Sequence, residues 1–409
     1  MEGLFKGDID DLQKLGALSG SDIGILEEAD KAAEDLAEPE YEHYMKREFN
    51  SEAIGILAKH NLFGIPVEKR YGGTASGALV HALTQQRLGY LGLGISTLYD
   101  VQTFIAEPAV QRWGTAEQKS EHLGNMCSGK SIFAFGLTEP DEGSDQSLIS
   151  TTYEESSGGY VLNGTKYLIS NGSICNYIIL FAARKASGQK KEVTAFIVDT
   201  KSKGFKVEMK LEEKIGLFTS DTSMLSFENV FVEKDAVLGG IGRGLHVAYS
   251  ALMNGRIGIG SACIGVIEAS LNASLKRSRE RVQHGKQIGK HQLIQQHISA
   301  MRQNLEMARW PIFCAAMKKQ EYDKDPDNGS ALQEMDMYSA MAKRIASRLA
   351  FESADRAVQV HGGFGYSLMS PVGQLFCDSR VARIYEGTDE IQDLKIASEL
   401  LGEEFKAYR

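Results

Sequence analysis

The chain has 409 residues, of which 43% are hydrophobic and 24% are charged. These ordinary values for a soluble globular protein exclude a disordered, collagen-like or coiled-coil chain. The formal net charge of −9 argues against a non-specific nucleic-acid binder, which needs a basic surface. A chain of this length is expected to fold into two or three domains.

Cysteine and histidine residues are scattered along the chain. The sequence contains no CxxC pair, HExxH motif or Cys/His cluster, so we expect reduced thiols and no metal site. No apolar run approaches the roughly 18 residues of a membrane-spanning helix. The N-terminal segment is acidic, whereas a signal or transit peptide would be basic. We therefore expect a cytoplasmic protein with no membrane association.

The first third of the chain, from about residue 21 to residue 130, has a helical pattern. Apolar residues recur at spacings of three and four, as on one face of a helix: Ile54, Leu57, Ala58 and Leu62. A Gly-rich turn at 71–73 interrupts the pattern, and Pro66 and Pro108 are expected to mark further breaks.

Between about residues 132 and 240 the apolar period changes to two, which predicts strands. Segments 151–155 and 160–163 flank Ser-Ser-Gly-Gly, a hairpin signal. Further strands are predicted over 176–183, 193–199 and 224–232.

From about residue 245 the pattern is helical again. Three apolar stripes, over 264–275, 294–305 and 335–349, are interpreted as core packing. Pro311 is expected to kink or end the second helix, and 323–330 is expected to be a loop. The predicted fold class is α+β multidomain, divided into a helical domain (1–131), a β domain (132–240) and a second helical domain (241–409).

Segment 383–392 carries the sharpest chemical signal, Arg-Ile-Tyr-Glu-Gly-Thr-Asp-Glu-Ile-Gln. Glu386 stands among aromatic and apolar residues, and burial would raise its pKa toward a value suited to proton abstraction. The alternative is a surface Glu that precedes a helix capped by Thr388. The local pattern alone favours this alternative.

The same segment resembles the C-terminal signature of the acyl-CoA dehydrogenase family, R-I-Y-E-G-T-x-E/Q-I-Q. Four further segments resemble motifs of that family in the same order: 135–145, 166–172, 281–286 and 359–365. The chain is therefore identified as a member. The resemblance implies an N-terminal helical domain, a small β-barrel-like domain, a C-terminal four-helix bundle, bound FAD and a homotetramer.

The resemblance also implies which residues bind FAD. Several match positions beside the flavin ring or its immediate surroundings: Phe135, Leu137, Thr138, Ser144, Ile169 and Ser170. Others match positions at the pyrophosphate or adenosine half, where glycine lets the backbone approach closely: Gln359, Gly362, Gly363, Thr388 and Glu390. Arg281 and Gln292 match residues that reach the FAD of a neighbouring subunit.

The implied reaction is dehydrogenation of an acyl-CoA thioester. Glu386 would remove the α-proton while the β-hydride moves to the flavin, and electrons would pass to an electron-transfer flavoprotein. Substrate contacts are expected from Ser144, Arg256, Tyr385 and Gly387. Some branches of the family take the base from the position that Gly255 holds here, so Glu386 has no competitor.

Three alternatives stay open. A dehydrogenase of acyl-carrier-protein thioesters is one, because Met253 replaces an Asp that helps the family hold the pantetheine arm. A non-catalytic, nucleic-acid-associated member is another, although the net charge opposes it. A nitroalkane oxidase would be expected to carry Asp at position 386.

Overall fold

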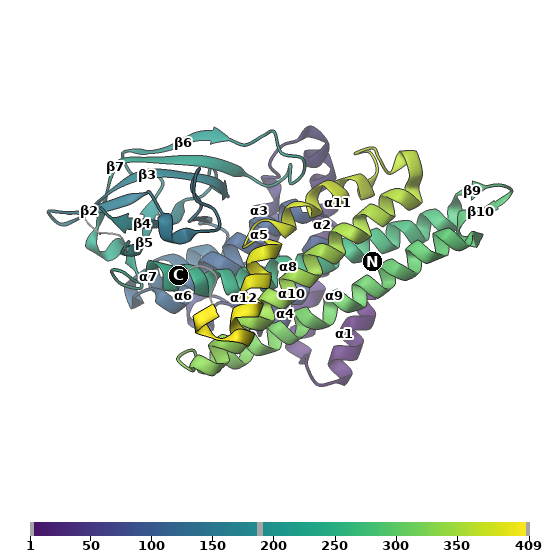
Figure 1. Ribbon diagram of the computed structural model, residues 1–409, viewed down its shortest axis with the longest axis horizontal. Helices are drawn as coiled ribbons and strands as arrows, with labels where there is room; N and C mark the ends of the chain where they lie inside the picture. Colours follow the sequence, from purple (N-terminus) through teal and green to yellow (C-terminus); the bar gives the residue numbers. More distant parts are fainter. Residues whose placement is uncertain (1–3, 186–190, 406–409) are drawn as a thin grey trace.

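The computed structural model describes residues 4–185 and 191–405 (Figure 1). Its first part is helical: α1 (Leu4–Lys14), α2 (Gly20–Lys46), α3 (Glu52–Lys59), α4 (Ala78–Gly89), α5 (Leu93–Asp100), α6 (Glu107–Trp113) and α7 (Ala116–Cys127). Capping boxes at Ser19 and Thr115 begin α2 and α7, where each hydroxyl accepts a backbone N–H of the first turn.

The middle part forms one mixed sheet in the order β6-β7-β3-β2-β4-β5-β8, with β1 parallel to β4. Its strands are β1 (Phe133–Gly136), β2 (Thr152–Ser156), β3 (Gly159–Ser170), β4 (Tyr177–Arg184), β5 (Val193–Asp199), β6 (Phe205–Lys210), β7 (Thr222–Glu233) and β8 (Val237–Leu238). The predicted hairpin is present, because Ser156 pairs with Gly159 across a turn in which Gly158 has φ of +88°.

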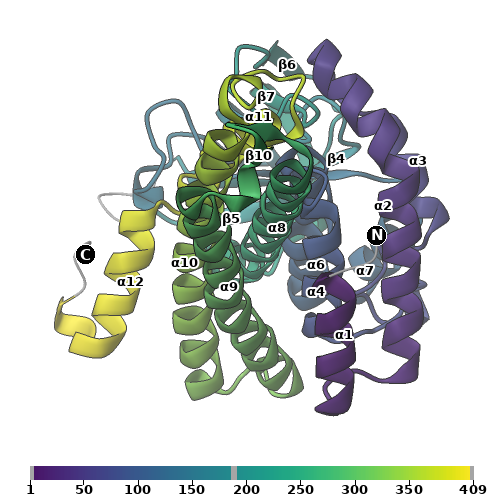
Figure 2. The same ribbon diagram turned by 90° about the vertical axis from the view of Figure 1, so that its right-hand side faces the viewer.

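The last part is a helical bundle. It contains α8 (Gly244–Glu280), the hairpin β9 (Val282–Gln283) and β10 (Lys286–Gln287), α9 (Gln292–Lys324), α10 (Gly329–His361), α11 (Pro371–Ser379) and α12 (Asp389–Leu401). Figure 2 shows α8, α9 and α10 side by side, with α12 on the outer side of α10. This arrangement confirms the predicted fold class.

Helix α8 is the central element of the molecule. Among the described residues it alone is long and apolar enough to cross a membrane, and 89% of its most apolar window is buried, so it is a core helix. Close packing requires glycine on both sides of its contact with α4. A Cβ atom at Gly265 would meet the backbone of α4 at 2.5 Å from the nitrogen of Tyr90, and one at Gly89 would meet α8 itself.

Three local predictions were wrong. Pro311 does not end helix α9, which continues to Lys324, because its buried face packs against α8 and α10 and outweighs one lost hydrogen bond. The chain also stays helical through Pro108, since a π-helical segment (Val101–Ala106) joins α5 to α6. The predicted loop at 323–330 shrinks to residues 325–328.

Strand β6 was not predicted. Five of its six residues are exposed, so its sequence, Phe-Lys-Val-Glu-Met-Lys, lacks an alternation that reports burial. It is an edge strand that pairs only with β7, and lysine is common on such edges.

Candidate active site

Glu386 lies in the short connection between a 3₁₀ turn (Val381–Arg383) and α12. Its backbone is left-handed, with φ of +54°, and Gly387 follows with φ of +90°. A non-glycine residue in this conformation costs on the order of 1 kcal/mol or more, and it persists where the surroundings fix it. The strained position therefore needs a specific set of supports.

The supports come from α10 and α12. The side-chain amide of Gln392 donates to the carbonyl oxygens of Glu386 (3.1 Å) and Gly387 (2.9 Å). The buried Lys343 donates from Nζ to the Gly387 carbonyl at 2.7 Å. Thr388 caps α12 by accepting from the Ile391 N–H at 3.3 Å. The capping expected of Thr388 and a structured Glu386 are thus both present.

The Glu386 side chain points toward α8. A Cβ atom at Gly255 would lie 2.8 Å from Oε2 of Glu386, so only glycine leaves room for the carboxyl group. Oε2 is buried and accepts no hydrogen bond from the described residues. Burial raises the pKa of Glu386, while its contact with Asp100 and the positive charges of Lys343 and Arg256 oppose that rise.

Arg256 reaches this region from α8 and is paired. Its guanidinium lies 2.6 Å from Asp336 on α10, and both side chains are largely shielded from water. Lys395 on α12 contacts the other oxygen of Asp336. The charge of Arg256 is therefore held in place by a partner from a second helix.

Two of the segments that resemble flavin-binding motifs meet where β1 and β3 end, which we call the sheet edge. The backbone N–H of Tyr167 donates to the Thr138 carbonyl at 2.9 Å. A register shift in β3 between Lys166 and Ile169 buries Ile169 and turns Leu168 outward, with φ of +57°. These contacts bring together Phe135, Leu137, Thr138, Ile169 and Ser170.

An ion pair with no exposed surface anchors this edge. Nζ of Lys166 lies 2.7 Å from Oε1 of Glu139 and 3.1 Å from the Leu137 carbonyl. Burial opposes ionisation, but Lys166 and hydrogen bonds from Ser150 and Thr151 lower the pKa of Glu139 to about 2. Lys166 therefore holds the residues on both sides of Thr138 in place.

Asn171 connects the sheet edge to α5. Its side-chain amide points to the carbonyl oxygens of Leu98 and Phe133, 3.4 Å from each. Leu98 belongs to the helix that ends in Asp100, the neighbour of Glu386. Helix α5 therefore contacts both the sheet edge, through Leu98, and Glu386, through Asp100. Ser144 lies in an exposed segment. Burial and the charge of the adjacent Asp145 raise the pKa of Tyr249 on α8.

Arg281 and the predicted pyrophosphate-binding residues lie far from Glu386. Arg281 follows Gly255 by 26 residues, or about 39 Å along α8. The hairpin beside Arg281 projects from the end of the bundle opposite the sheet (Figure 1). Arg277 of α8 lies over Phe364, which places Gln359, Gly362 and Gly363 at this same end. One chain thus carries two separated sets of predicted cofactor residues.

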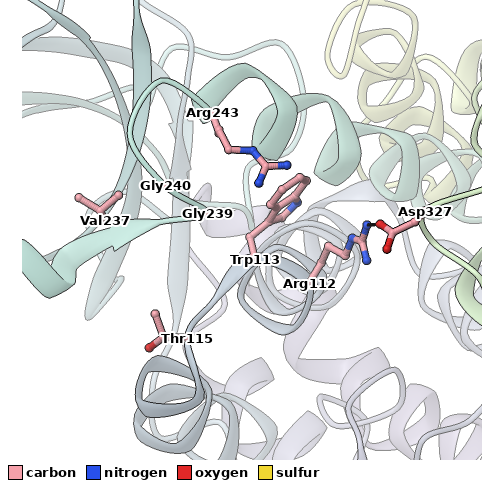
Figure 3. Close-up of a pocket in the computed structure, with 8 residues that line it drawn as sticks. All are labelled: Arg112, Trp113, Thr115, Val237, Gly239, Gly240, Arg243 and Asp327. Carbon is pink, nitrogen blue, oxygen red and sulfur yellow. Dashed lines mark hydrogen bonds and ion pairs between the residues drawn. The ribbon is translucent and has the colours of Figure 1, made fainter. Parts of the chain in front are cut away.

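A cavity of about 460 Å³ opens beside the start of α8, and no predicted site residue lines it (Figure 3). Arg112 is paired with Asp327 at 2.8 Å, and Arg243 lies over the Trp113 ring at 4.8 Å. The guanidinium groups of Arg112 and Arg243 therefore each have a partner within the chain.

Asp100 and Lys343 were not among the site residues predicted from the sequence. Both are completely buried and both contact the segment around Glu386. An acidic residue inside an otherwise apolar and uncharged helical run was the available signal for Asp100.

Comparisons with known proteins agree with this geometry. The N-terminal, middle and C-terminal domains of acyl-CoA dehydrogenase match residues 23–130, 134–230 and 242–401. The chain belongs to the acyl-CoA dehydrogenase family. This membership implies an oxidoreductase, and members of the family depend on FAD.

Three relatives illustrate the acyl-CoA dehydrogenase match. The chain is 36% identical to an acyl-CoA dehydrogenase of Bacillus subtilis over 87% of its own length and 91% of the relative. It is 33% identical to caffeyl-CoA reductase-Etf complex subunit CarC of Acetobacterium woodii, over 91% and 97%. The structure of butyryl-CoA dehydrogenase from Megasphaera elsdenii superposes with a TM-score of 0.88 and 32% identity, covering 94% and 99%.

The residues present fit FAD. A Cβ atom at Gly362 or Gly363 would meet no atom within 4 Å, so the backbone there is open to a ligand. Arg281 is exposed, and its guanidinium suits a diphosphate. In this acyl-CoA dehydrogenase family member, the open backbone and the exposed cation both lie at the hairpin end of the bundle.

Proposed function

We propose that this protein is an FAD-dependent enzyme that dehydrogenates an acyl-CoA thioester between its α- and β-carbons. The observation that carries the proposal is Glu386, a shielded carboxyl group with a raised pKa that faces the glycine surface of α8. A carboxylate in such a place is suited to remove a weakly acidic carbon-bound proton.

Glu386 accepts the α-proton of the thioester, and the electron pair of that C–H bond becomes the new double bond as the β-hydride leaves. FAD supplies the acceptor for the hydride. Lys343 and Arg256 favour the ionised form of Glu386 before the transfer. The backbone N–H of Glu386 binds the thioester carbonyl oxygen and stabilises the charge that develops there.

The remaining predicted residues position the two ligands. Thr138 and Ser170, with Phe135, Leu137 and Ile169 behind them, hold the flavin ring at the sheet edge. Ser144, Arg256, Tyr385 and Gly387 line the path of the thioester. Arg281, Gln292, Gln359, Gly362 and Gly363 contact the FAD of a neighbouring subunit. Thr388 and Glu390 lie toward its adenosine half.

The proposed assembly is a homo-oligomer, and the surface of α9 supports it. Large apolar side chains on this helix are 44–74% exposed at spacings that return to one face: Leu293, Met307, Trp310 and Met317. An electron-transfer flavoprotein is the proposed electron acceptor, because the relative from Acetobacterium woodii is named as a subunit of an Etf complex.

The test is anaerobic titration of the purified flavoprotein with acyl-CoAs of four to sixteen carbons, straight and branched. We expect the flavin absorbance to bleach with at least one thioester and the product to be its 2-enoyl form. The chemically reduced enzyme is then mixed with the matching enoyl-CoA, since the named Acetobacterium relative is a reductase. A protein that binds no flavin, or whose flavin no thioester reduces, contradicts the proposal.

A further inference from the structure

Asp100 ends α5 directly beside Glu386. Its side chain is completely buried. A Cβ atom at Gly258 would clash with Oδ1 of Asp100, just as one at Gly255 would clash with Glu386. Residues three apart lie on the same face of a helix. The two carboxyl groups therefore lie side by side against one glycine surface of α8.

Apart from the carboxyl group of Glu386, no side chain in the described part of the chain makes a hydrogen bond to Asp100. Neither carboxyl oxygen accepts a hydrogen bond from a described amide, hydroxyl or cation, and the hydrogen bond that Asp100 shares with Glu386 needs a proton on one of the two acids. The positive charges of Lys343 and Arg256 lower the pKa of Glu386, and neither is among the causes that shift the pKa of Asp100. Burying a polar group without a partner costs on the order of 1–3 kcal/mol, and more for a charge. Such a residue is expected where a ligand supplies the missing partner.

The acyl group of the proposed substrate would come next to Asp100. Its α-carbon must approach Glu386 closely for proton transfer, and its β-carbon must face the flavin. The γ-carbon is then the first position free to carry another group. The Phe104 ring closes the space on the next turn. Its Cγ would lie 2.7 Å from a Cβ atom at Gly258, and the ring stacks on the His81 ring with the two centroids 3.5 Å apart.

We propose that Asp100 is a specificity-determining residue, and that the enzyme prefers a short acyl thioester whose γ-carbon carries a hydrogen-bond donor, either a hydroxyl or a protonated amine. This inference rests on the proposed function. A donor at that position satisfies the oxygen of Asp100 that the hydrogen bond with Glu386 leaves free, and an alkyl chain leaves that oxygen unpaired. Sites built to bind a donor discriminate strongly against analogues that lack it.

The experiment compares matched thioesters by stopped-flow flavin reduction in the FAD-loaded enzyme. The hydroxyl arm pairs 4-hydroxybutyryl-CoA with pentanoyl-CoA, which has a methyl group in place of the hydroxyl. The amine arm pairs 4-(dimethylamino)butyryl-CoA, protonated at neutral pH, with 5-methylhexanoyl-CoA. In the wild-type enzyme we expect the donor-bearing member of at least one pair to be preferred about 100-fold in the ratio of rate to apparent Kd.

Two variants assign the preference to Asp100. Asp100→Leu keeps the approximate shape but removes both acceptors, and it should reverse the preference at least tenfold in favour of the alkyl chain. Asp100→Asn keeps one acceptor oxygen but no charge, so it should retain hydroxyl recognition and lose ammonium recognition. Ser96→Ala is the matched control, because Ser96 is equally buried on α5 and its hydroxyl donates only to the Gly92 carbonyl.

Each result decides between outcomes. Equal efficiency within both pairs in the wild type, or an unchanged ratio in Asp100→Leu, overturns the inference and leaves the dehydrogenase proposal intact. Failure of every thioester, including the straight-chain series, instead overturns the proposed function. FAD content and thermal unfolding check folding: Asp100→Leu should unfold at a temperature at or above that of the wild type, because it removes a buried acid that lies against a second acid.

Discussion

The carboxyl group of Glu386, which stands in the connection before α12, fills the space that a side chain at Gly255 of α8 would need. A Cβ atom at position 255 would lie within 2.9 Å of all three atoms of the Glu386 carboxyl group. This relationship explains why the base can stand at position 386: α8 presents no side chain there. It also makes the two positions mutually exclusive for a large side chain, which leads to the first prediction.

Glu386→Gln keeps the shape of the side chain but cannot accept a proton. General-base catalysis typically contributes 10²–10⁴-fold, and we expect the rate of flavin reduction to fall by about 10⁴-fold, with binding of enoyl-CoA retained. Stopped-flow reduction by the best thioester measures the rate. A rate within tenfold of the wild type would place the base elsewhere. The double variant Glu386→Gly/Gly255→Glu, which exchanges the two residues, should recover part of the lost rate.

The rate of flavin reduction should depend on pH through Glu386. The group must be ionised to accept a proton, so the rate falls as the pH drops through its pKa, which burial raises. Lys343 lowers that pKa, and Lys343→Met should therefore move the acid limb of the profile to higher pH. Asp100, Arg256, Cys263 and Tyr385 also face this region and stay unchanged. Lys46→Met, at an exposed lysine on α2, should leave the profile in place; an unshifted limb in Lys343→Met contradicts the assignment.

The buried pair of Lys166 and Glu139 should stabilise the sheet edge only as a pair. Glu139→Gln leaves the Lys166 ammonium buried without its partner, and we expect a loss of about 3–5 kcal/mol in the free energy of unfolding. The double variant Glu139→Gln/Lys166→Met should recover most of it. Urea unfolding at neutral pH measures both, and equal stabilities of the single and double variants would contradict this account.

The same carboxyl group predicts an acid limit. The folded-state pKa of Glu139, about 2, lies below the unfolded value of about 4.3. Its contribution to stability is therefore complete above that unfolded value and is lost as the pH falls toward 2. Urea midpoints between pH 6 and pH 2 should fall less steeply in the double variant than in the wild type.

Arg281→Ala should lose FAD and oligomer together, because the proposed function assigns its guanidinium, about 39 Å along α8 from Gly255, to an FAD shared with another subunit. The ratio of flavin to protein absorbance and the mass by light scattering measure the two effects. Arg279→Ala, an exposed arginine two residues earlier, is the matched control. Full retention of FAD and of mass in Arg281→Ala would contradict the shared site.

Several features follow from the sequence alone because their causes are local. The turn chemistry of Ser-Ser-Gly-Gly predicts the β2–β3 hairpin, and the change of apolar period predicts the order helical, β, helical. The five motifs identify the family because each is a contiguous run of residues. Even the capping of α12 by Thr388 is readable, since a cap needs only its own first turn.

Other features are decided only by tertiary structure, because they depend on residues far apart in the chain. Packing against α8 and α10 keeps α9 helical through Pro311, where local propensity predicts a break. Residues 100, 258 and 386 stand in three separate sequence contexts, and no spacing rule connects them. The fold presses α5 and the turn before α12 onto the glycine face of α8, and this contact alone sets a second buried acid beside the proposed base.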